Sequence, residues 1–327
     1  MKILISGSVA FDYLMTFPGY FKDHILPEHL ESISLSFLVD SMVRHRGGIA
    51  PNIAYTMALF GERPRLWATV GEDFDEYRAW LEQKGVDTSG ARVIEDEFTA
   101  SFFVNTDRSN AQIASFYPGA MAYAGQMSFF ELVDDLPDLV IISPNDPSAM
   151  LGFVDQCLGL KIPYFYDPSQ QIVRLAGEEL QKGILGAHAL FVNEYEAALI
   201  NNMTGMKPPD ILAADDKNQD RFVVITRGEQ GISIFTNNGT HNIPIVPAKE
   251  IIDPTGVGDA FRGGFLTGYS HNLDLETCGR MGALAATYCL EQRAPQGHSF
   301  TPAEFVNRYR EHFDDQGKLD QFIGDFG

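Results

Sequence analysis

The chain has 327 residues, enough for one large α/β domain or for such a domain with a small appendage. Hydrophobic residues make up 45% and charged residues 21%, so the chain can bury a sizeable core. Its 24 basic and 44 acidic residues give a formal net charge of −20, which argues against nucleic acid and membrane surfaces as partners. The three cysteines are scattered without a CxxC motif, which favours reduced thiols in the cytoplasm over disulfides or a zinc site.

Short apolar segments alternate with helical segments along the chain, a pattern typical of a mostly parallel sheet covered by helices. Strands are predicted, in chain order, over residues 2–7, 65–71, 138–143, 163–168, 189–193 and 221–228. Helices are predicted over residues 51–61, 75–85, 259–269 and 277–290. Another helix begins after Thr301, where Pro302 at the first turn and Glu304 at the third position complete a capping-box pattern.

Two segments interrupt this alternation. Residues 12–46 have mixed apolar patterns with prolines and no clear helix, and residues 99–119 form a hairpin pattern around the turn at 107–110. We expect both to leave the α/β core and to associate into a small separate sheet. The predicted organisation is one α/β domain over residues 1–327, with an appendage formed by insertions at about 12–46 and 98–119.

A glycine-rich turn, "DPTGVGD" at residues 253–259, precedes the predicted helix that begins at Asp259. Gly256 and Gly258 can adopt positive φ, so consecutive N–H groups can converge on one point. The helix N-terminus adds its own unpaired N–H groups and the positive end of its dipole, which completes a cradle for an anion. Asp259 beside this cradle suits a base that takes a proton from an attacking hydroxyl. The alternative is a first-turn acid that only stabilises the helix.

Other nucleotide-binding motifs are missing. The chain has no GxxxxGK[ST] sequence, which excludes a Walker-type P-loop. The first predicted strand is followed by Gly7-Ser8-Val9-Ala10-Phe11 and not by GxGxxG, which disfavours a dinucleotide-binding dehydrogenase. No HRD or DFG element supports a protein kinase.

Three motifs resemble those of the ribokinase-like (PfkB) kinases. "GGIAPN" at 47–52 is similar to the first signature GGxxxN, "DPTGVGDAF" at 253–261 to the second signature DTxGAGD, and "NEYE" at 193–196 to the motif NxxE. Segments such as "GSVAFDYLMTFPG", "AQIASFYPGAM" and "DPSQQ" resemble bacterial adenosine kinases of the mycobacterial type. Pro254 and Val257 depart from the general pattern, although both residues also occur in that subgroup.

The resemblance implies a ribokinase-like α/β fold, with a central mostly parallel sheet flanked by helices and a small β-sheet lid. It further implies Mg²⁺-dependent transfer of phosphate from ATP to the 5′-hydroxyl of adenosine, giving AMP and ADP, in a cytoplasmic enzyme that dimerises through its lid. A monovalent cation such as K⁺ activates some relatives. Whether it does so here stays open, because Pro254 removes one N–H from the loop.

The resemblance also assigns residues to roles. Asp259 is the expected general base, and the amides of Gly256, Val257 and Gly258 would bind the phosphoryl group in transfer. The expected nucleoside contacts are Ser8, Asp12, Ser36, Gly47, Gly48, Asn52, Phe102, Phe116, Gln170, Gln171 and Arg174. Among these, Asp12 and Asn52 would bind the ribose, although Asn52 could simply cap a helix. Phe102 and Phe116 would sandwich the purine, although aromatic residues on a small sheet normally form its own core.

On the ATP side, Thr226, Gly228 and Gly231 would contact the nucleotide. Asn193 and Glu196 would organise Mg²⁺ through water and phosphate without ligating it directly, or they would only cap a helix. Two rival functions remain: a PfkB-type kinase of another nucleoside or of a sugar such as ribose or fructose, and a nucleoside-binding protein without turnover. The aromatic pair favours a purine over a small polyol, and Asp259 argues against pure binding, which needs no base.

Overall fold

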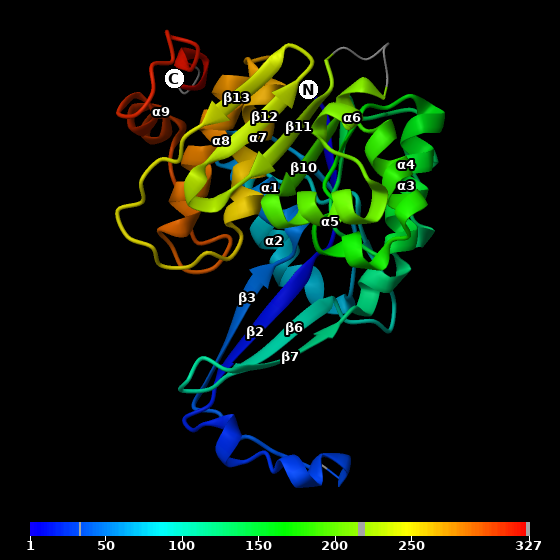
Figure 1. Ribbon diagram of the computed structural model, residues 1–327, viewed down its shortest axis with the longest axis vertical. Helices are drawn as coiled ribbons and strands as arrows, with labels where there is room; N and C mark the ends of the chain where they lie inside the picture. Colours follow the sequence, from blue (N-terminus) through cyan, green and yellow to red (C-terminus); the bar gives the residue numbers. More distant parts are fainter. Residues whose placement is uncertain (33, 215–219, 325–327) are drawn as a thin grey trace.

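The main sheet forms the centre of the molecule. A computed structural model describes residues 1–32, 34–214 and 220–324, and within them this sheet has nine strands in the order β13-β12-β11-β10-β9-β8-β1-β4-β5 (Figure 1). Their bounds are β1 Ile3–Ser6, β4 Arg65–Val70, β5 Ala91–Val93, β8 Leu139–Ile142, β9 Tyr164–Tyr166, β10 Ala189–Asn193, β11 Phe222–Thr226, β12 Ile232–Thr236 and β13 Gly239–Ile243. All neighbouring strands pair in parallel except β11-β12 and β12-β13, which are antiparallel.

Helices cover both faces of the main sheet, because alternate strand residues point to opposite sides. On β1, Ile3 and Ile5 belong to one buried cluster and Leu4 to the other. The first face is covered by α1 Ile49–Ala58, α2 Asp75–Lys84, α7 Val257–Ser270 and α8 Leu275–Leu290. The second is covered by α3 Pro147–Leu160, α4 Gly177–Gly186, α5 Glu194–Thr204 and α6 Pro208–Ala213. Helix α9, Pro302–Arg310, packs against α8, where the rings of Phe305 and Tyr288 stack.

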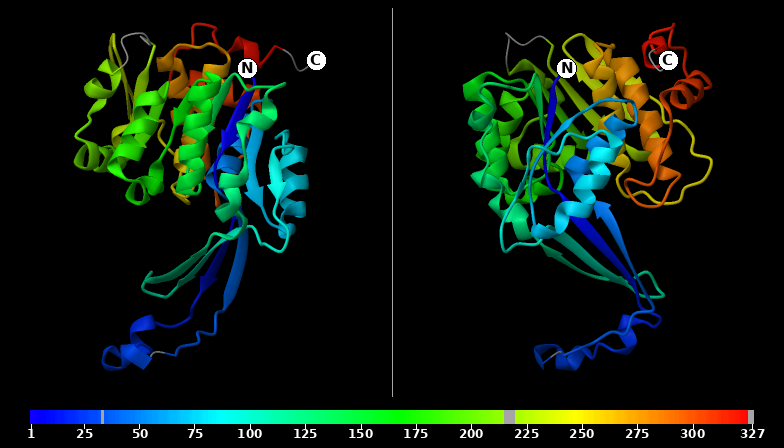
Figure 2. Two further views of the ribbon diagram at one scale, coloured as in Figure 1. Left: turned by 90° about the vertical axis from the view of Figure 1, so that its right-hand side faces the viewer. Right: turned by 180° about the vertical axis from the view of Figure 1, so that it is seen from behind.

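A smaller sheet projects from the body of the molecule (Figure 2). It has the order β3-β2-β6-β7, with β2 Ala10–Thr16, β3 Ser41–Gly47, β6 Ala100–Thr106 and β7 Gln112–Tyr117. The structure confirms the predicted hairpin, because β6 and β7 pair antiparallel around the turn at 107–111. The 12–46 segment supplies most of β2 and all but the last residue of β3, joined by a loop with 3₁₀ turns at the far end of the sheet; residue 33 lies outside the described residues.

The elements predicted from the sequence are present with small shifts at their ends. At α9, Thr301 accepts a hydrogen bond from the Glu304 amide and Glu304 accepts one from the Thr301 amide, which confirms the capping box. The prediction omitted β5, which has only three residues, and the antiparallel pair β12 and β13. No helix in the described ranges is long and apolar enough to span a membrane.

Candidate functional site

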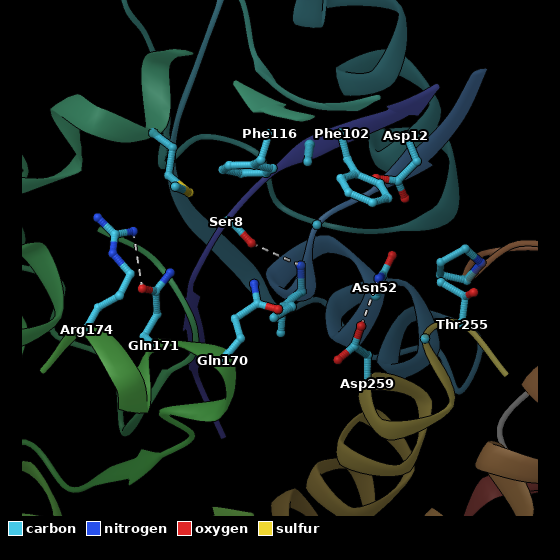
Figure 3. Close-up of a pocket in the computed structure, with 16 residues that line it drawn as sticks. Ser8, Asp12, Asn52, Phe102, Phe116, Gln170, Gln171, Arg174, Thr255 and Asp259 are labelled. Carbon is cyan, nitrogen blue, oxygen red and sulfur yellow. Dashed lines mark hydrogen bonds between the residues drawn. The ribbon is translucent and has the colours of Figure 1, made fainter. Parts of the chain in front are cut away.

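A pocket of about 510 Å³ lies where the small sheet meets the carboxyl ends of the central strands (Figure 3). This edge is where open α/β sheets bind ligands. Eleven of the predicted site residues line the pocket: Ser8, Asp12, Gly48, Asn52, Phe102, Phe116, Gln170, Gln171, Arg174, Gly256 and Asp259. Ala10, Ile49, Met121, Thr255 and Pro295 complete its wall.

The glycine turn places the start of α7 at the pocket wall. Gly256 precedes the helix with a φ of +77°, and a Cβ built on it would come within 2.5 Å of the Pro295 Cβ. Glycine is therefore required at position 256, both for the positive φ of the backbone and for the close approach of Pro295. Gly258 does not use its freedom to adopt a positive φ: α7 begins two residues earlier than predicted, at Val257, and Gly258 adopts helical geometry. Val257 and Gly258 do not line the pocket itself.

Asp259 lies half-buried in the first turn of α7 and receives a hydrogen bond of 2.8 Å from the Asn52 Nδ2 to its Oδ2. Removal from water is the main cause that raises the pKa of Asp259 to about 7, and the nearby carboxylates of Asp167 and Asp12 add to it. The charge of Arg262 and the hydrogen bond from Asn52 oppose this rise. A carboxylate with a pKa near neutrality can both accept and release a proton at physiological pH.

Asp12, Phe102 and Phe116 form a row across the small sheet. Asp12 on β2 pairs with Phe102 on β6, and Phe102 pairs with Phe116 on β7. Directly paired residues share a face of a sheet, and this face closes one side of the pocket, opposite Asn52 and Asp259 (Figure 3). Burial raises the pKa of Asp12 to about 6. Phe116 is 49% exposed and Phe102 is half-buried, so neither aromatic residue is buried as a core residue of the small sheet.

Gly47 and Gly48 join β3 to α1 beside this row. A Cβ on Gly47 would lie 2.5 Å from the Asp12 Oδ2, although Gly47 itself does not line the pocket. Gly48 has a φ of +94°, and a Cβ there would meet the Ser8 carbonyl oxygen at 2.5 Å. The two glycines thus let α1 begin close to Ser8 and Asp12 and bring Asn52, which is 5% exposed, into the pocket.

The opposite end of the pocket is polar. Gln170, Gln171 and Arg174 belong to a 3₁₀ segment, Ser169–Arg174, that follows β9. The Arg174 Nη1 donates to the Gln171 Oε1 at 3.4 Å, and Gln171 is buried while Arg174 is exposed. Ser36 is not brought to this pocket: it lies exposed in the loop between β2 and β3, at the far end of the small sheet.

The five residues predicted to contact ATP and Mg²⁺ lie outside the pocket, further along the same edge of the sheet. Asn193 and Thr226 end the neighbouring strands β10 and β11 and pair with each other. Asn193 and Glu196 form a reciprocal capping box at the start of α5, each accepting from the other's amide at 2.8 Å. Gly228 and Gly231 have φ values of +54° and +81° in the turn that leads to β12. The described residues contain no cluster of three or more acidic, histidine or cysteine side chains that could hold a metal ion.

Sequence reasoning missed a buried ion pair that lies between the pocket and the residues predicted to contact ATP and Mg²⁺. Arg262, one turn into α7, donates through Nη2 to the Asp167 Oδ1 at 2.7 Å and through Nη1 to the Gly258 carbonyl oxygen at 2.9 Å. Asp167 follows β9 and is 1% exposed. The pair ties the start of α7 to the sheet edge. Asp167 lies in the segment "DPSQQ" and Arg262 in "DAFRGG". Nothing in either segment indicates that the two side chains meet.

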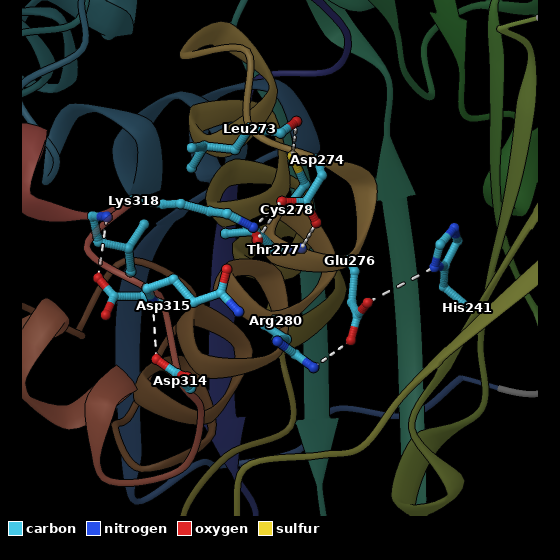
Figure 4. Close-up of polar contacts among 12 residues, drawn as sticks. His241, Leu273, Asp274, Glu276, Thr277, Cys278, Arg280, Asp314, Asp315 and Lys318 are labelled. Atoms are coloured by element: carbon cyan, nitrogen blue, oxygen red, sulfur yellow. Dashed lines mark hydrogen bonds and ion pairs between the residues drawn. The ribbon is translucent and has the colours of Figure 1, made fainter.

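Helix α8 packs along α7 and supports it from behind. Asp274 caps α8 by accepting from the Thr277 amide at 3.0 Å, and Lys318 from the C-terminal region donates to the other Asp274 oxygen at 2.8 Å (Figure 4). In the first turn of α8, Glu276 pairs with Arg280 and approaches His241 of β13. These contacts tie the first turn of α8 to β13 and to the C-terminal segment, next to the end of α7 at Gly268.

Comparison with known proteins places this geometry in a family. Residues 9–301 match the model of the pfkB family of carbohydrate kinases. The nucleoside kinase of Methanocaldococcus jannaschii is 29% identical over 95% of this chain and 97% of its own length. Its crystal structure, described as an archaeal member of the ribokinase family, has a TM-score of 0.84 over 95% of this chain and 99% of that one, at 28% identity. The predicted ribokinase-like α/β fold is therefore confirmed.

Two further proteins are similar over most of their length. The nucleoside kinase of Burkholderia thailandensis in complex with inosine has a TM-score of 0.82 at 36% identity, over 95% of this chain and 98% of that one. The same enzyme is also known in a complex with ADP and inosine. The cytidine kinase of Thermococcus kodakarensis is 28% identical over 83% of this chain and 96% of its own length.

Proposed function

Since the chain belongs to the pfkB family of carbohydrate kinases, we propose that it transfers the γ-phosphoryl group of ATP to the 5′-hydroxyl of a nucleoside. The observation that carries the proposal is the position of Asp259. This acid, whose pKa is raised to about 7, shares one pocket with Asp12 and an aromatic pair, and it stands in the first turn of a helix. The inosine and ADP-inosine complexes of the Burkholderia enzyme support a nucleoside acceptor and ATP as donor.

In this proposal Asp259 is the general base. The ionised carboxylate takes the proton of the 5′-hydroxyl as that oxygen attacks the phosphorus atom. The amides at Gly256, Val257 and Gly258, of which Val257 also donates to the Pro254 carbonyl oxygen at 3.4 Å, and the positive end of the α7 dipole stabilise negative charge on the phosphoryl group during transfer. The buried Arg262 adds a positive charge beside Asp259 and favours its charged form.

The nucleoside would lie along the pocket with its ribose at Asp12, Asn52, Gly48 and Ser8 and its base between Phe102 and Phe116. A carboxylate accepts from two vicinal hydroxyls, which fits the 2′- and 3′-hydroxyls of ribose. The polar end at Gln170, Gln171 and Arg174 would contact the edge of the base. Adenosine is the substrate implied by the resemblance of the sequence, and it enters the proposal as one candidate among the nucleosides.

ATP would lie along the sheet edge from α7 towards Thr226, Gly228 and Gly231. Glu196 and Asn193 fit a Mg²⁺ ion held through water and phosphates, because the Glu196 carboxylate keeps free lone pairs beyond its hydrogen bonds to Ser169 and Asn193. When bound, the ion would neutralise charge on the phosphates. K⁺ enters only as an activator, to be tested by exchanging it for Na⁺ in the assay.

The small sheet would act as a lid that excludes water during transfer. Its pocket face continues outward through Leu14 and Val43, which are 38% and 48% exposed. A second copy of the chain would cover this apolar strip, since an exposed sheet face of this kind favours association. A sedimentation mass of twice 36.3 kDa is the expected result for the dimer, and a mass of 36.3 kDa would exclude it.

The proposal predicts ADP release that depends on a nucleoside. The purified protein is incubated with Mg·ATP and, in separate reactions, adenosine, inosine, guanosine, cytidine, ribose and fructose, and ADP is measured. Turnover of at least one nucleoside with kcat/KM well above that of both sugars is expected. Turnover of ribose or fructose alone would assign the chain to the sugar kinases, and binding of nucleosides without any ADP would favour a binding protein.

Replacing Phe116 with Ala should raise KM for the preferred nucleoside about tenfold, because one aromatic face of the base site is lost. Turnover of a free sugar should change little, since a sugar does not reach this residue. Phe103→Ala is the matched control, because Phe103 is the next residue after Phe102 on β6 and stacks on Tyr13, outside the pocket. Equal losses in both variants would mean that Phe116 serves only the stability of the sheet.

A further inference from the structure

A chain of hydrogen bonds links the base of the small sheet to Asp259. The Gln296 Nε2 donates both to the Asn52 Oδ1 at 2.8 Å and to the Tyr77 hydroxyl at 2.5 Å. The Tyr77 hydroxyl donates to the Gly47 carbonyl oxygen, at the end of β3, at 3.0 Å. At the other end, the Asn52 Nδ2 donates to the Asp259 Oδ2 at 2.8 Å. Gln296, from the loop after α8, thus joins α2, α1 and α7.

Gln296 determines which way the Asn52 carboxamide faces. Because an amide nitrogen can only donate, the Gln296 Nε2 requires an acceptor and holds the Asn52 oxygen towards itself. The Asn52 nitrogen then points at Asp259 as a donor. Within the described part of the chain, the Asn52 carboxamide hydrogen-bonds with these two residues and no others. A reversed Asn52 would turn its oxygen towards the Asp259 carboxylate, and two acceptors would then face each other.

We propose that Gln296 is a positioning residue for the phosphoryl transfer described above: it holds Asn52 as a donor to Asp259 and so keeps the Asp259 carboxylate charged and able to accept the proton of the substrate hydroxyl. The inference rests on the proposed function. It extends that function to a residue that does not line the pocket and belongs to none of the three family motifs.

Charges of opposite effect surround Asp259, so the hydrogen bond from Asn52 influences whether its carboxylate is ionised. Arg262 on the same helix favours the charged form, whereas Asp12 of β2 and Asp167 after β9 oppose it. Glu196 of α5 acts on the Asp167–Arg262 pair, and the Cys289 thiol of α8 also faces Asp259. With these opposing charges fixed by the fold, loss of the Asn52 donor removes a hydrogen bond to the charged form and shifts proton binding towards higher pH.

The test measures kcat/KM against pH for wild type and for Gln296→Met, which keeps the side-chain length and has no donor. The acidic limb of the profile should shift towards higher pH by about one unit in the variant. At about pH 6 the variant should be roughly tenfold less active than wild type, and at about pH 9.5, where Asp259 is ionised in both proteins, the two should agree within about threefold. Gln296→Glu should move the limb at least as far, because its carboxylate would accept from the Asn52 nitrogen and reverse the carboxamide.

Gln156→Met is the matched control. Gln156 on α3 accepts from the Phe129 amide at 2.6 Å and does not line the pocket, so the same substitution should lower stability without moving the pH profile. The inference would be overturned if the Gln296→Met profile superimposed on that of wild type, or if its kcat/KM were lower by the same factor at every pH. A wild-type protein that phosphorylates no nucleoside would instead overturn the proposed function, so the two failures are distinguishable.

Discussion

Replacing Asp259 with Asn is expected to lower kcat by a factor of about 100 to 10,000, the usual contribution of a general base. The Asn side chain has nearly the same shape and can still accept from the Asn52 Nδ2, so the pocket keeps its form. It cannot take the proton of the 5′-hydroxyl. The Kd for the nucleoside should therefore change by less than about threefold, and single-turnover kinetics with calorimetric binding would separate the two effects.

The same substitution should make the folded protein more stable at neutral and alkaline pH. The pKa of Asp259 is raised from 3.8 to about 7 on folding, so between these values the folded protein binds more protons than the unfolded chain. The free energy of unfolding then falls as pH rises through this window. A carboxamide at this position does not ionise and carries no such cost, so the Tm of the Asp259→Asn variant should exceed that of wild type by a few degrees at pH 8. The difference should fade towards pH 4.

Asp274→Asn is the control with the opposite sign. Burial opposes ionisation of Asp274, but hydrogen bonds from Lys318 and Thr277 outweigh it and lower its pKa to about 2. Its contribution to stability is present above pH 3.8 and is lost as pH falls towards 2. Asp274→Asn should thus lower the Tm at neutral pH and leave kcat within about threefold. A Tm for Asp259→Asn that falls at pH 8, together with unchanged kcat, would remove Asp259 from the role of base.

Local sequence signals predicted most of the fold. The apolar runs that became β1, β4, β8, β9, β10 and β11 are buried on both faces, so their composition alone identified them as strands. The sequence "ISIFT" of β12 has the composition of a strand but was overlooked. Strand β13 carried less signal, because it lies at one end of the sheet and has the mixed sequence "GTHNI". Such a strand is specified by its partner and carries little signal of its own.

The site was predictable where a motif or strand end carries it and unpredictable where distant segments meet. Gly256, Asp259 and Asn52 lie in motifs, and the structure brings them to one pocket. The row of Asp12, Phe102 and Phe116 was expected only from the family resemblance, because it depends on the register of three strands, which no local pattern fixes. Gln296 lies 244 residues from Asn52, in a loop whose sequence has no motif. Only the folded arrangement assigns it a partner.

Replacing Gly256 with Ala should lower kcat about a hundredfold. An Ala residue would have to hold a φ of +77°, and its Cβ would stand 2.5 Å from the Pro295 Cβ. The start of α7 or the loop at Pro295 must therefore shift. Because the amides of Gly256 to Gly258 and the Asp259 carboxylate move together with this turn, a displacement of about 1 Å takes them out of line with the reacting atoms, and a loss of about 100-fold is typical of such misplacement.

Gly205→Ala separates this steric effect from the cost of the backbone conformation. Gly205 ends α5 with a φ of +75°, and a Cβ there meets nothing within 4 Å. The control therefore carries only the cost of a left-handed Ala, about 1–2 kcal/mol of unfolding free energy, and its kcat should equal that of wild type. If Gly256→Ala lost stability like the control but kept kcat within about threefold, the turn would not position the transferring group. A hundredfold loss confined to Gly256→Ala is expected, because only there does the new methyl group meet the wall of the pocket.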